Sequence, residues 1–315
     1  MQYRRVGRSG LEVSRLALGT MTWGSSVDAY EAAEQLTAFR DAGGTLVDTA
    51  PIYGEGACEE LLGTLIAKEG VRDEIVLAGK AGFTYRRGEV VKDGSRGSLL
   101  DQLDLSLRQL GTDHLDLWQI HTPDLEVPLE ETLGALEHAV RTGRTRYVGI
   151  SNFTGWQTGI AHTWLAARDI PLVSTQVEYS LVNRDPEAEV TQAASHLGMG
   201  VLAWSPLGRG VLTGKYRGGS VPTDSRGASP GWDEFVGAYL TPAKSGVVEA
   251  LARASEGLGV TIAHVAIAWL LERPQVSAAI IGARTTSQLQ ENLASEDLVL
   301  PPEIIDALDD VSGEV

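Results

Sequence analysis

The sequence has little that would place the protein in an oxidising compartment or in a membrane. It contains one cysteine, Cys58, so an internal disulfide is excluded and a reducing compartment is favoured. No hydrophobic run reaches the roughly 20 residues that a transmembrane helix needs, and the first residues lack the pattern of a signal peptide. We therefore expect a cytoplasmic protein that has no membrane partner.

Positive charge is also scarce. The 26 Lys and Arg residues face 42 Asp and Glu residues, which gives a net charge of −16 at pH 7. So acidic a surface argues against nucleic acid as a partner, although a local basic pocket for one phosphate remains compatible with it. The sequence permits a homo-oligomer but does not indicate one.

The common nucleotide-binding loops are missing as well. Residues 54–59 (GEGACE) lack the third glycine of a dinucleotide fingerprint, and residues 208–210 (GRG) fail the same test. Residues 214–216 (GKY) lack the Ser or Thr of a P-loop. A nucleotide would have to be bound by another arrangement.

What the chain does have is a regular alternation of short apolar runs and helical patterns. Eight strand–helix units in one chain predict an α/β protein of the (β/α)8 TIM barrel class, since eight units close into a barrel more readily than they form an open sheet. The predicted strands cover residues 16–19, 45–47, 75–79, 115–120, 147–150, 172–176, 201–204 and 278–281. The predicted helices cover about 29–41, 58–68, 99–110, 129–142, 164–168, 186–196, 247–258, 262–271 and 287–293.

Three segments fall outside this alternation. Residues 3–15 are expected to form an N-terminal hairpin that plugs one end of the barrel, and residues 301–311 to form an extra C-terminal helix. Residues 218–231 are rich in Gly, Ser and Pro and form a loop on the active face, a candidate lid.

Polar side chains follow three successive predicted strands. Asp48 and Tyr53 come after the second strand, Lys80 after the third and His121 after the fourth. A parallel barrel carries its chemistry at the carboxyl ends of its strands, so these four groups can converge. Each alone has an ordinary interpretation as a cap, a packing residue or a core histidine. Together they suit the delivery of a proton to a carbonyl oxygen.

Several motifs in order along the chain resemble those of the aldo-keto reductases. The resemblance implies one barrel domain over residues 1–315 that uses NADPH, less often NADH, to reduce aldehydes or ketones to alcohols without a metal. Such an enzyme is an oxidoreductase acting on CH–OH groups. The motifs are residues 43–54 (GGTLVDTAPIYG), Lys80, 116–121 (DLWQIH), 149–153 (GISNF), 176–179 (QVEY), 205–208 (SPLG) and 281–284 (IGAR).

The resemblance assigns a catalytic role to each of the four polar residues. Tyr53 would be the general acid, although a free tyrosine with a pKa of about 10 is too weak an acid near neutral pH. Lys80 would lower that pKa by roughly one to three units, and Asp48 would hold the lysine in place. His121 would hydrogen-bond the substrate oxygen.

The resemblance also distributes a nucleotide over the later strand ends. Ser151, Asn152 and Gln176 would bind the carboxamide and Tyr179 would stack on the nicotinamide. Further contacts are implied for Thr20, Met21, Ser205, Pro206, Leu207, Gly208, Arg209, Gly210 and Lys215, several of them through backbone N–H groups on the pyrophosphate.

The adenosine end is expected near the last helix. Arg284, Gln288 and Asn292 are four residues apart and share one face. Ser287 and Gln290 fit a capping box, which places a helix start beside Arg284, and a helix N-terminus with an arginine is a phosphate site. This pattern favours NADPH over NADH. The neighbouring candidates are Gly282 and Glu291.

The substrate pocket is the least determined part. Aromatic walls suit an apolar or aromatic carbonyl or a sugar ring. Trp118 and Trp204 lie within predicted strands and are assigned to packing. The candidate substrate contacts are Trp23, Phe83, Tyr85, Thr122 and Trp232.

Two other functions stay open. The barrel could bind nucleotide as a regulatory subunit with little turnover, because the aldo-keto reductase family includes relatives of potassium-channel β-subunits. A metal-dependent barrel hydrolase would need clustered His and carboxylate ligands at the strand ends, where only His121 is so placed, so no metal is expected.

Overall fold

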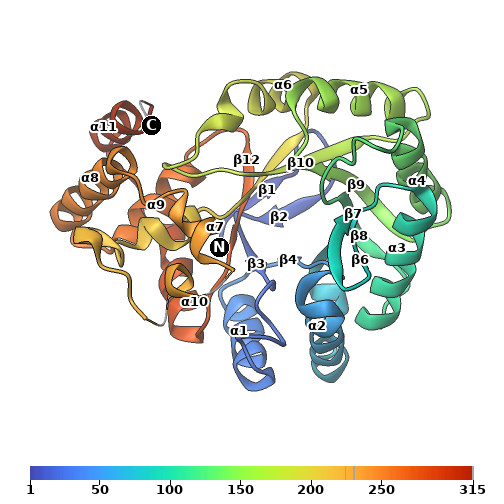
Figure 1. Cartoon of the computed structure of the whole chain (residues 1–315), viewed down its shortest axis with the longest axis horizontal. Helices are drawn as coiled ribbons and strands as arrows, with labels where there is room; N and C mark the ends of the chain where they lie inside the picture. The colour runs from blue at the N-terminus through green and yellow to red at the C-terminus, as the bar shows by residue number, and fades with distance from the viewer. Residues whose placement is uncertain (224, 230, 314–315) are drawn as a thin grey trace.

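The computed structural model describes residues 1–223, 225–229 and 231–313 and confirms the barrel (Figure 1). Eight parallel strands close in the order β10-β11-β12-β3-β4-β5-β8-β9. Their bounds are β3 (Leu16–Gly19), β4 (Leu46–Asp48), β5 (Val76–Ala81), β8 (Leu115–Ile120), β9 (Thr145–Ser151), β10 (Leu172–Glu178), β11 (Gly200–Trp204) and β12 (Val276–Ile281).

Helices surround the barrel, as the alternating pattern predicts (Figure 1). The predicted extra C-terminal helix is present as α11, while α6 begins only at Val190 because Pro186 sits in a preceding 3-10 turn. The helices are α1 (Ala29–Asp41), α2 (Ala57–Glu69), α3 (Arg96–Leu110), α4 (Leu129–Arg141), α5 (Gly155–Ala166), α6 (Val190–Leu197), α7 (Asp233–Gly237), α8 (Pro242–Leu258), α9 (Ile262–Leu271), α10 (Thr286–Leu293) and α11 (Pro302–Ser312).

The hairpin formed by β1 (Tyr3–Arg5) and β2 (Glu12–Ser14) closes one end of the barrel, as predicted. Val6, Leu11 and Val13 pack with the apolar residues of the barrel interior, such as Leu117 and Leu202. A second, larger core lies between the strands and the helices. The interior is therefore filled, and chemistry is confined to the other end.

A second hairpin, β6 (Phe83–Arg86) and β7 (Glu89–Lys92), follows β5 and was not expected from the sequence. It stands beside the carboxyl end of the barrel (Figure 1). The candidate lid, residues 218–231, contains only short 3-10 turns in its described parts, while Asp224 and Pro230 lie outside the described residues.

Among the described residues, no single helix has the length and apolar composition to cross a membrane. Helices α8 and α9 reach that composition only as a pair, which is bent by 99°.

Candidate active site

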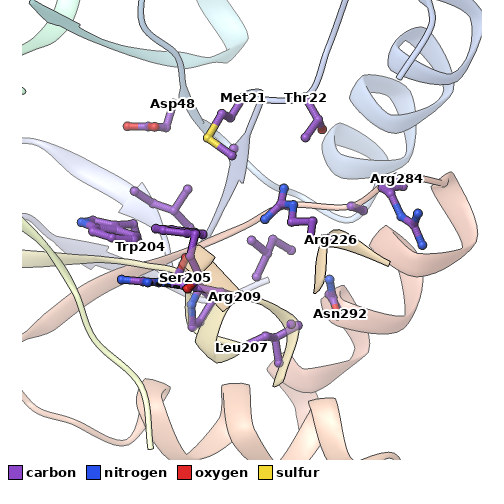
Figure 2. A pocket seen from close by; sticks show the side chains of 18 of the residues that line it. Met21, Thr22, Asp48, Trp204, Ser205, Leu207, Arg209, Arg226, Arg284 and Asn292 are labelled. Carbon is purple, nitrogen blue, oxygen red and sulfur yellow. Dashed lines mark hydrogen bonds between the residues drawn. The ribbon is translucent and has the colours of Figure 1, made fainter. Parts of the chain in front are cut away.

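A cavity of about 830 Å³ opens at the carboxyl ends of the barrel strands. Figure 2 shows side chains from several strand ends and from the loops after β11 and β12 pointing into it. Asp48 and Trp204 lie on one side of this view, and Arg226, Arg284 and Asn292 lie on the other. The cavity thus has two chemically different ends.

The four polar residues that follow the strands meet at one end of the cavity. Asp48 is the last residue of β4, Lys80 lies near the end of β5, and both are buried. The Lys80 ammonium donates hydrogen bonds to the Asp48 carboxylate, to the Tyr53 hydroxyl at 3.2 Å and to the Thr49 carbonyl at 3.2 Å. The ammonium is therefore held by three acceptors, one of which is the phenol that faces the cavity.

Burial sets the protonation states of this group. It raises the pKa of the Tyr53 phenol, and the opposing effect of Lys80 does not cancel it. Burial acts to lower the pKa of Lys80, but Asp48 and Tyr53 outweigh it and raise that pKa. Burial lowers the pKa of His121 well below 6.5, and Lys80 acts in the same direction. Near neutral pH the lysine is charged, whereas the phenol and the imidazole are neutral.

Lys80 acts on the Tyr53 pKa in the predicted direction, but burial outweighs it, so the pKa of the phenol lies above that of a free tyrosine. The neighbouring Asp48 carboxylate also opposes the formation of a phenolate. What the ammonium does is limit the rise in pKa that burial alone would cause. The phenol keeps its proton until negative charge develops in front of it.

His121 lies edge-on to two rings. Its ring centroid is 5.8 Å from that of Tyr53 and 4.9 Å from that of Phe83, with interplanar angles of 84° and 82°. The His121 backbone carbonyl accepts a hydrogen bond from the Asn152 amide at 2.9 Å. The imidazole is thus positioned beside the phenol, where both can reach one oxygen atom in the cavity.

Most of the residues that the sequence assigned to nucleotide or substrate contacts line the cavity. The side-chain amide of Gln176 donates to Asp48 at 2.8 Å, which connects the nucleotide candidates to the catalytic candidates. The lining includes Met21, Phe83, Ser151, Asn152, Gln176, Ser205, Pro206, Leu207, Arg209, Gly210, Lys215, Trp232, Gly282, Arg284, Gln288, Glu291 and Asn292.

Two aromatic predictions were wrong. The Trp23 side chain is fully buried and donates from its indole nitrogen to Gln35 of α1, so it is a core residue and not a pocket wall. Tyr179 donates its hydroxyl to Glu187 at 2.6 Å and packs edge-on against Trp269, outside the cavity lining. Tyr179 therefore does not offer its ring to a ligand in this cavity.

The structure places four other predicted contacts outside the lining. The Thr20 hydroxyl donates to the Asp48 backbone carbonyl at 3.0 Å and is buried behind it. Gly208 and Thr122 are buried beneath the surface of the cavity. Tyr85 is 42% exposed on the β6–β7 hairpin. Thr20 therefore supports Asp48 instead of facing the cavity.

Arg209 lines the cavity, but its guanidinium is engaged in contacts with other residues of the protein. It forms a two-pronged ion pair with Glu178 at 2.7 and 2.5 Å and donates to the Phe235 carbonyl at 2.6 Å. The same group stacks on the Phe235 ring at 3.6 Å. Arg209 therefore fastens α7 to the end of β10, and only its backbone remains suited to the predicted contact.

Sequence reasoning missed several residues of the cavity, among them Trp204, Arg226 and Val90. Trp204 is the last residue of β11 and lines the cavity, with its indole nitrogen donating to Asn152 at 3.1 Å. The prediction that it serves packing alone was wrong. Arg226, in the loop after β11, also lines the cavity, and no local motif distinguishes it from other loop arginines.

The backbone of the rim is strained. Among the described residues, Asn152, Ser205 and Arg209 have positive φ angles of 61°, 51° and 58°, and all three line the cavity. Asparagine adopts this conformation readily, but for serine and arginine it is uncommon and costs free energy that the surrounding structure has to supply. The turn after β11 therefore holds two cavity residues, Ser205 and Arg209, in an uncommon backbone conformation.

The far end of the cavity carries positive charge. Lys215, Arg226 and Arg284 line it, and the neighbouring Arg284 adds to burial in lowering the pKa of Arg226. Two guanidinium groups this close suit an anion. Helix α10 begins here, as predicted, although its cap is Thr285, whose hydroxyl accepts from the Gln288 backbone N–H, and not Ser287.

No group of three or more His, Cys, Asp or Glu side chains in the described ranges could hold a metal ion.

Comparison with known proteins assigns the family. The sequence model of the aldo/keto reductase family matches residues 15–312. The chain is 36% identical over 318 residues to a probable voltage-gated potassium channel subunit beta from Oryza sativa subsp. japonica, covering 99% of this chain and 96% of the relative. It is 36% identical over 303 residues to the L-glyceraldehyde 3-phosphate reductase of Escherichia coli K12, covering 93% and 87%. It is 32% identical over 302 residues to the aldo-keto reductase YhdN of Bacillus subtilis, covering 92% and 87%. The chain belongs to the aldo/keto reductase family of oxidoreductases.

Proposed function

We propose that this protein reduces aldehydes or ketones to alcohols with NADPH, and that Tyr53 delivers the proton. The observation that carries the proposal is the hydrogen bond of 3.2 Å between the Lys80 ammonium and the Tyr53 hydroxyl, at the wall of a large cavity. A protonated phenol beside a fixed cation can give up its proton when charge develops on a nearby oxygen.

Each of the four residues has its own role in the proposed reaction. Bound NADPH would supply a hydride to the carbonyl carbon. Tyr53 protonates the oxygen, and Lys80 stabilises the negative charge that the phenol acquires. Asp48 keeps Lys80 charged and in place. His121, neutral because burial lowers its pKa, donates a hydrogen bond that orients the carbonyl oxygen.

The far end of the cavity supports NADPH as the cofactor. The extra phosphate of NADPH needs cationic partners, and Arg226 and Arg284 lie close together at the start of α10. Gln176 and Asn152 supply amide groups at the catalytic end, and the Trp204 ring offers a flat surface there. These residues suit the two ends of one dinucleotide.

The walls near Tyr53 suit an uncharged organic carbonyl. Met21, Phe83 and Val90 line the cavity, and the last two come from the unexpected β6–β7 hairpin, while Trp232 lies against Arg226 at the far end. Apolar and aromatic walls bind by burying apolar surface. The substrate of the bacterial relative from Escherichia coli carries a phosphate, which these walls would not favour.

The decisive experiment follows NADPH absorbance with a panel of aldehydes and ketones. We expect turnover by the wild type and a loss of about 10³-fold or more in kcat for Tyr53→Phe, because the general acid is removed while the ring stays. NADPH affinity should change little in this variant. Retained activity would remove the proton-donor assignment. Wild-type NADPH binding without turnover would favour a regulatory role, which the potassium-channel subunit relatives suggest.

A further inference from the structure

The β6–β7 hairpin extends one wall of the catalytic cavity toward solvent. Phe83, the first residue of β6, lies edge-on to His121, with 4.9 Å between the two ring centroids. Val90 of β7 also lines the cavity and is 52% exposed. The hairpin therefore starts beside the candidate carbonyl site and continues outward from it.

The strand register shows which other side chains share the side of the hairpin that carries Phe83 and Val90. Tyr85 pairs directly with Val90, and Lys92 pairs directly with Phe83. Directly paired residues point to the same side of a sheet, and so do residues two apart on one strand. Tyr85 is therefore on the cavity side. It is exposed and lies outside the cavity lining, so it continues outward the wall that Phe83 and Val90 begin.

The hairpin is held in this register by its turn and its base. Arg87 and Gly88 both have positive φ angles, as a two-residue type I′ turn requires. At the base, the Asp93 backbone N–H donates to the Gly82 carbonyl at 2.9 Å, and the Arg86 guanidinium donates to the Asp93 carboxylate at 2.6 Å. The face that carries the aromatic rings is thus fixed on the side of the cavity. The opposite face carries Thr84, Arg86, Glu89 and Val91.

Lys92 brings one charge to the cavity side of the hairpin. Its side chain is exposed and does not line the cavity. A lysine can lay its aliphatic stem along an apolar surface while its ammonium group stays in water. The charge therefore does not interrupt the apolar wall that runs from Phe83 through Val90 to Tyr85.

We propose that Phe83, Val90 and Tyr85 form a tail subsite, which binds an extended aliphatic or arylalkyl chain attached to the carbonyl group of the substrate. The inference deepens the proposed reductase function and rests on it for the identity of the group that faces Tyr53. The continuity of the wall selects the occupant. Because Phe83 lies beside His121, a chain that covers Phe83 belongs to the molecule held in the cavity. A hydrocarbon chain fits because this contact removes apolar surface of both partners from water.

The length of the tail subsite predicts the length of the preferred chain. Phe83 and Tyr85 are two residues apart on one strand, which corresponds to about 7 Å. An extended carbon chain advances about 1.3 Å per methylene, given C–C bonds of about 1.5 Å, so about five methylenes span the subsite. We expect kcat/KM to rise by up to about fourfold per methylene from butanal to about nonanal. It should level off for dodecanal, whose end would extend past Tyr85 into water.

Val90 and Val91 are adjacent valines on opposite faces of the hairpin and give a matched pair of variants. Val90→Thr puts a hydroxyl in the tail subsite and should lower the ratio of octanal to butanal kcat/KM at least about fourfold. Val91→Thr makes the same change on the other face and should leave this ratio within about twofold. Threonine favours strands as valine does, so the hairpin should persist in both variants. Equal effects of the two variants would overturn the tail subsite.

A binding measurement separates this inference from the proposed function. Butanamide and octanamide carry a carbonyl oxygen but do not accept a hydride from NADPH, so their binding is independent of turnover. By calorimetry with NADP+ present, octanamide should bind the wild type and Val91→Thr at least about tenfold more tightly than butanamide. Val90→Thr and Tyr85→Ser should each reduce that difference at least about fourfold.

The two proposals then fail in different ways. If no aldehyde or ketone were reduced while the amides kept this pattern, the reductase function would fail and the tail subsite would stand. If the wild type bound both amides equally, the tail subsite would be excluded even in an active reductase. An equal loss of the chain-length preference in Val90→Thr and Val91→Thr would exclude it as well.

Discussion

The two ends of the cavity are built by different means. At the catalytic end, which comprises Asp48, Tyr53, Lys80 and His121, three side chains come from strand ends and Tyr53 from the 3-10 turn after β4. Hydrogen bonds join Lys80 to Asp48 and Tyr53, and ring contacts hold His121. At the phosphate end, which comprises Lys215, Arg226 and Arg284, long cationic side chains come from loops and from the start of a helix.

The difference reflects what each end has to do. Proton transfer requires fixed distances, and a barrel strand fixes the position of a side chain better than a loop does. Recognition of an anion requires charge and accessible donors, which loop residues and a helix N-terminus supply with less demand on geometry. On the proposed roles, we expect the catalytic end to be sensitive to single substitutions and the phosphate end to divide the binding among several residues.

Lys80→Met is expected to have the largest effect, because it breaks the network of the catalytic end. Activity should fall about 10³-fold or more, since the phenol loses its cation. The buried Asp48 carboxylate would lose its charged partner, so the free energy of unfolding should fall by about 3–5 kcal/mol. Activity assays and urea unfolding measure the two effects separately.

The double variant Lys80→Met with Asp48→Asn separates the effect on stability from the effect on activity. It removes both charges, so much of the lost stability should return while activity stays absent. Recovery of activity in this variant would show that the charge of Lys80 is not needed. An unchanged stability in Lys80→Met would show that the pair does not hold this end together.

The sequence predicted the catalytic end better than the phosphate end for a physical reason. Asp48, Lys80 and His121 follow strands whose apolar runs are readable, and strand ends meet at one edge of a barrel. Arg226 lies in a long loop whose path no periodicity determines. The β6–β7 hairpin was missed because its strands are short and exposed.

Aromatic residues were the hardest to place from sequence. Trp204 closes strand β11, and at a strand end the alternation of faces no longer tells whether a ring turns to the core or the cavity. Trp23 follows β3 by a few residues and points back to Gln35. Both side-chain orientations depend on backbone turns that tertiary contacts determine. The local sequence pattern therefore could not tell the cavity residue, Trp204, from the core residue, Trp23.

Glu59, in the first half of the barrel, is a buried carboxyl that differs from the paired charged groups around Lys80. It is fully buried in the first turn of α2, and burial raises its pKa to about 7, against the smaller opposing effects of Ser106 and Lys80. The folded state thus binds its proton more tightly than the unfolded chain, in which the pKa is near 4.5. The contribution to stability is present below about pH 4.5 and is lost as the pH rises toward 7.

This buried carboxyl predicts a pH effect of intermediate size. Between pH 5 and pH 8 the wild type should lose about 3 kcal/mol of unfolding free energy relative to Glu59→Gln, since one pKa unit corresponds to about 1.4 kcal/mol. Urea unfolding at both pH values measures the difference. Glu60→Gln, at the exposed neighbouring position, is the control. If the unfolding free energies of the wild type and Glu59→Gln changed equally with pH, the pKa of Glu59 could not be raised.

The smallest expected effect is at the phosphate end. Arg284→Ala should raise the dissociation constant for NADPH about 10- to 100-fold, which corresponds to the loss of one charge-assisted contact of about 1.4–2.8 kcal/mol. The constant for NADH, which lacks the extra phosphate, should change by less than about threefold. Fluorescence titration measures both constants.

Two further variants test whether several residues of the phosphate end contribute to NADPH binding. Arg226→Ala should weaken NADPH binding in the same direction, because its guanidinium lies near that of Arg284. Arg253→Ala, on the exposed side of α8 and away from the cavity lining, should leave both cofactors unaffected. If Arg284→Ala weakened NADPH and NADH equally, the arginine would act on a part common to both nucleotides. Arg284 would then bind the pyrophosphate, which NADPH and NADH share. The cavity would not have a separate end for the extra phosphate of NADPH.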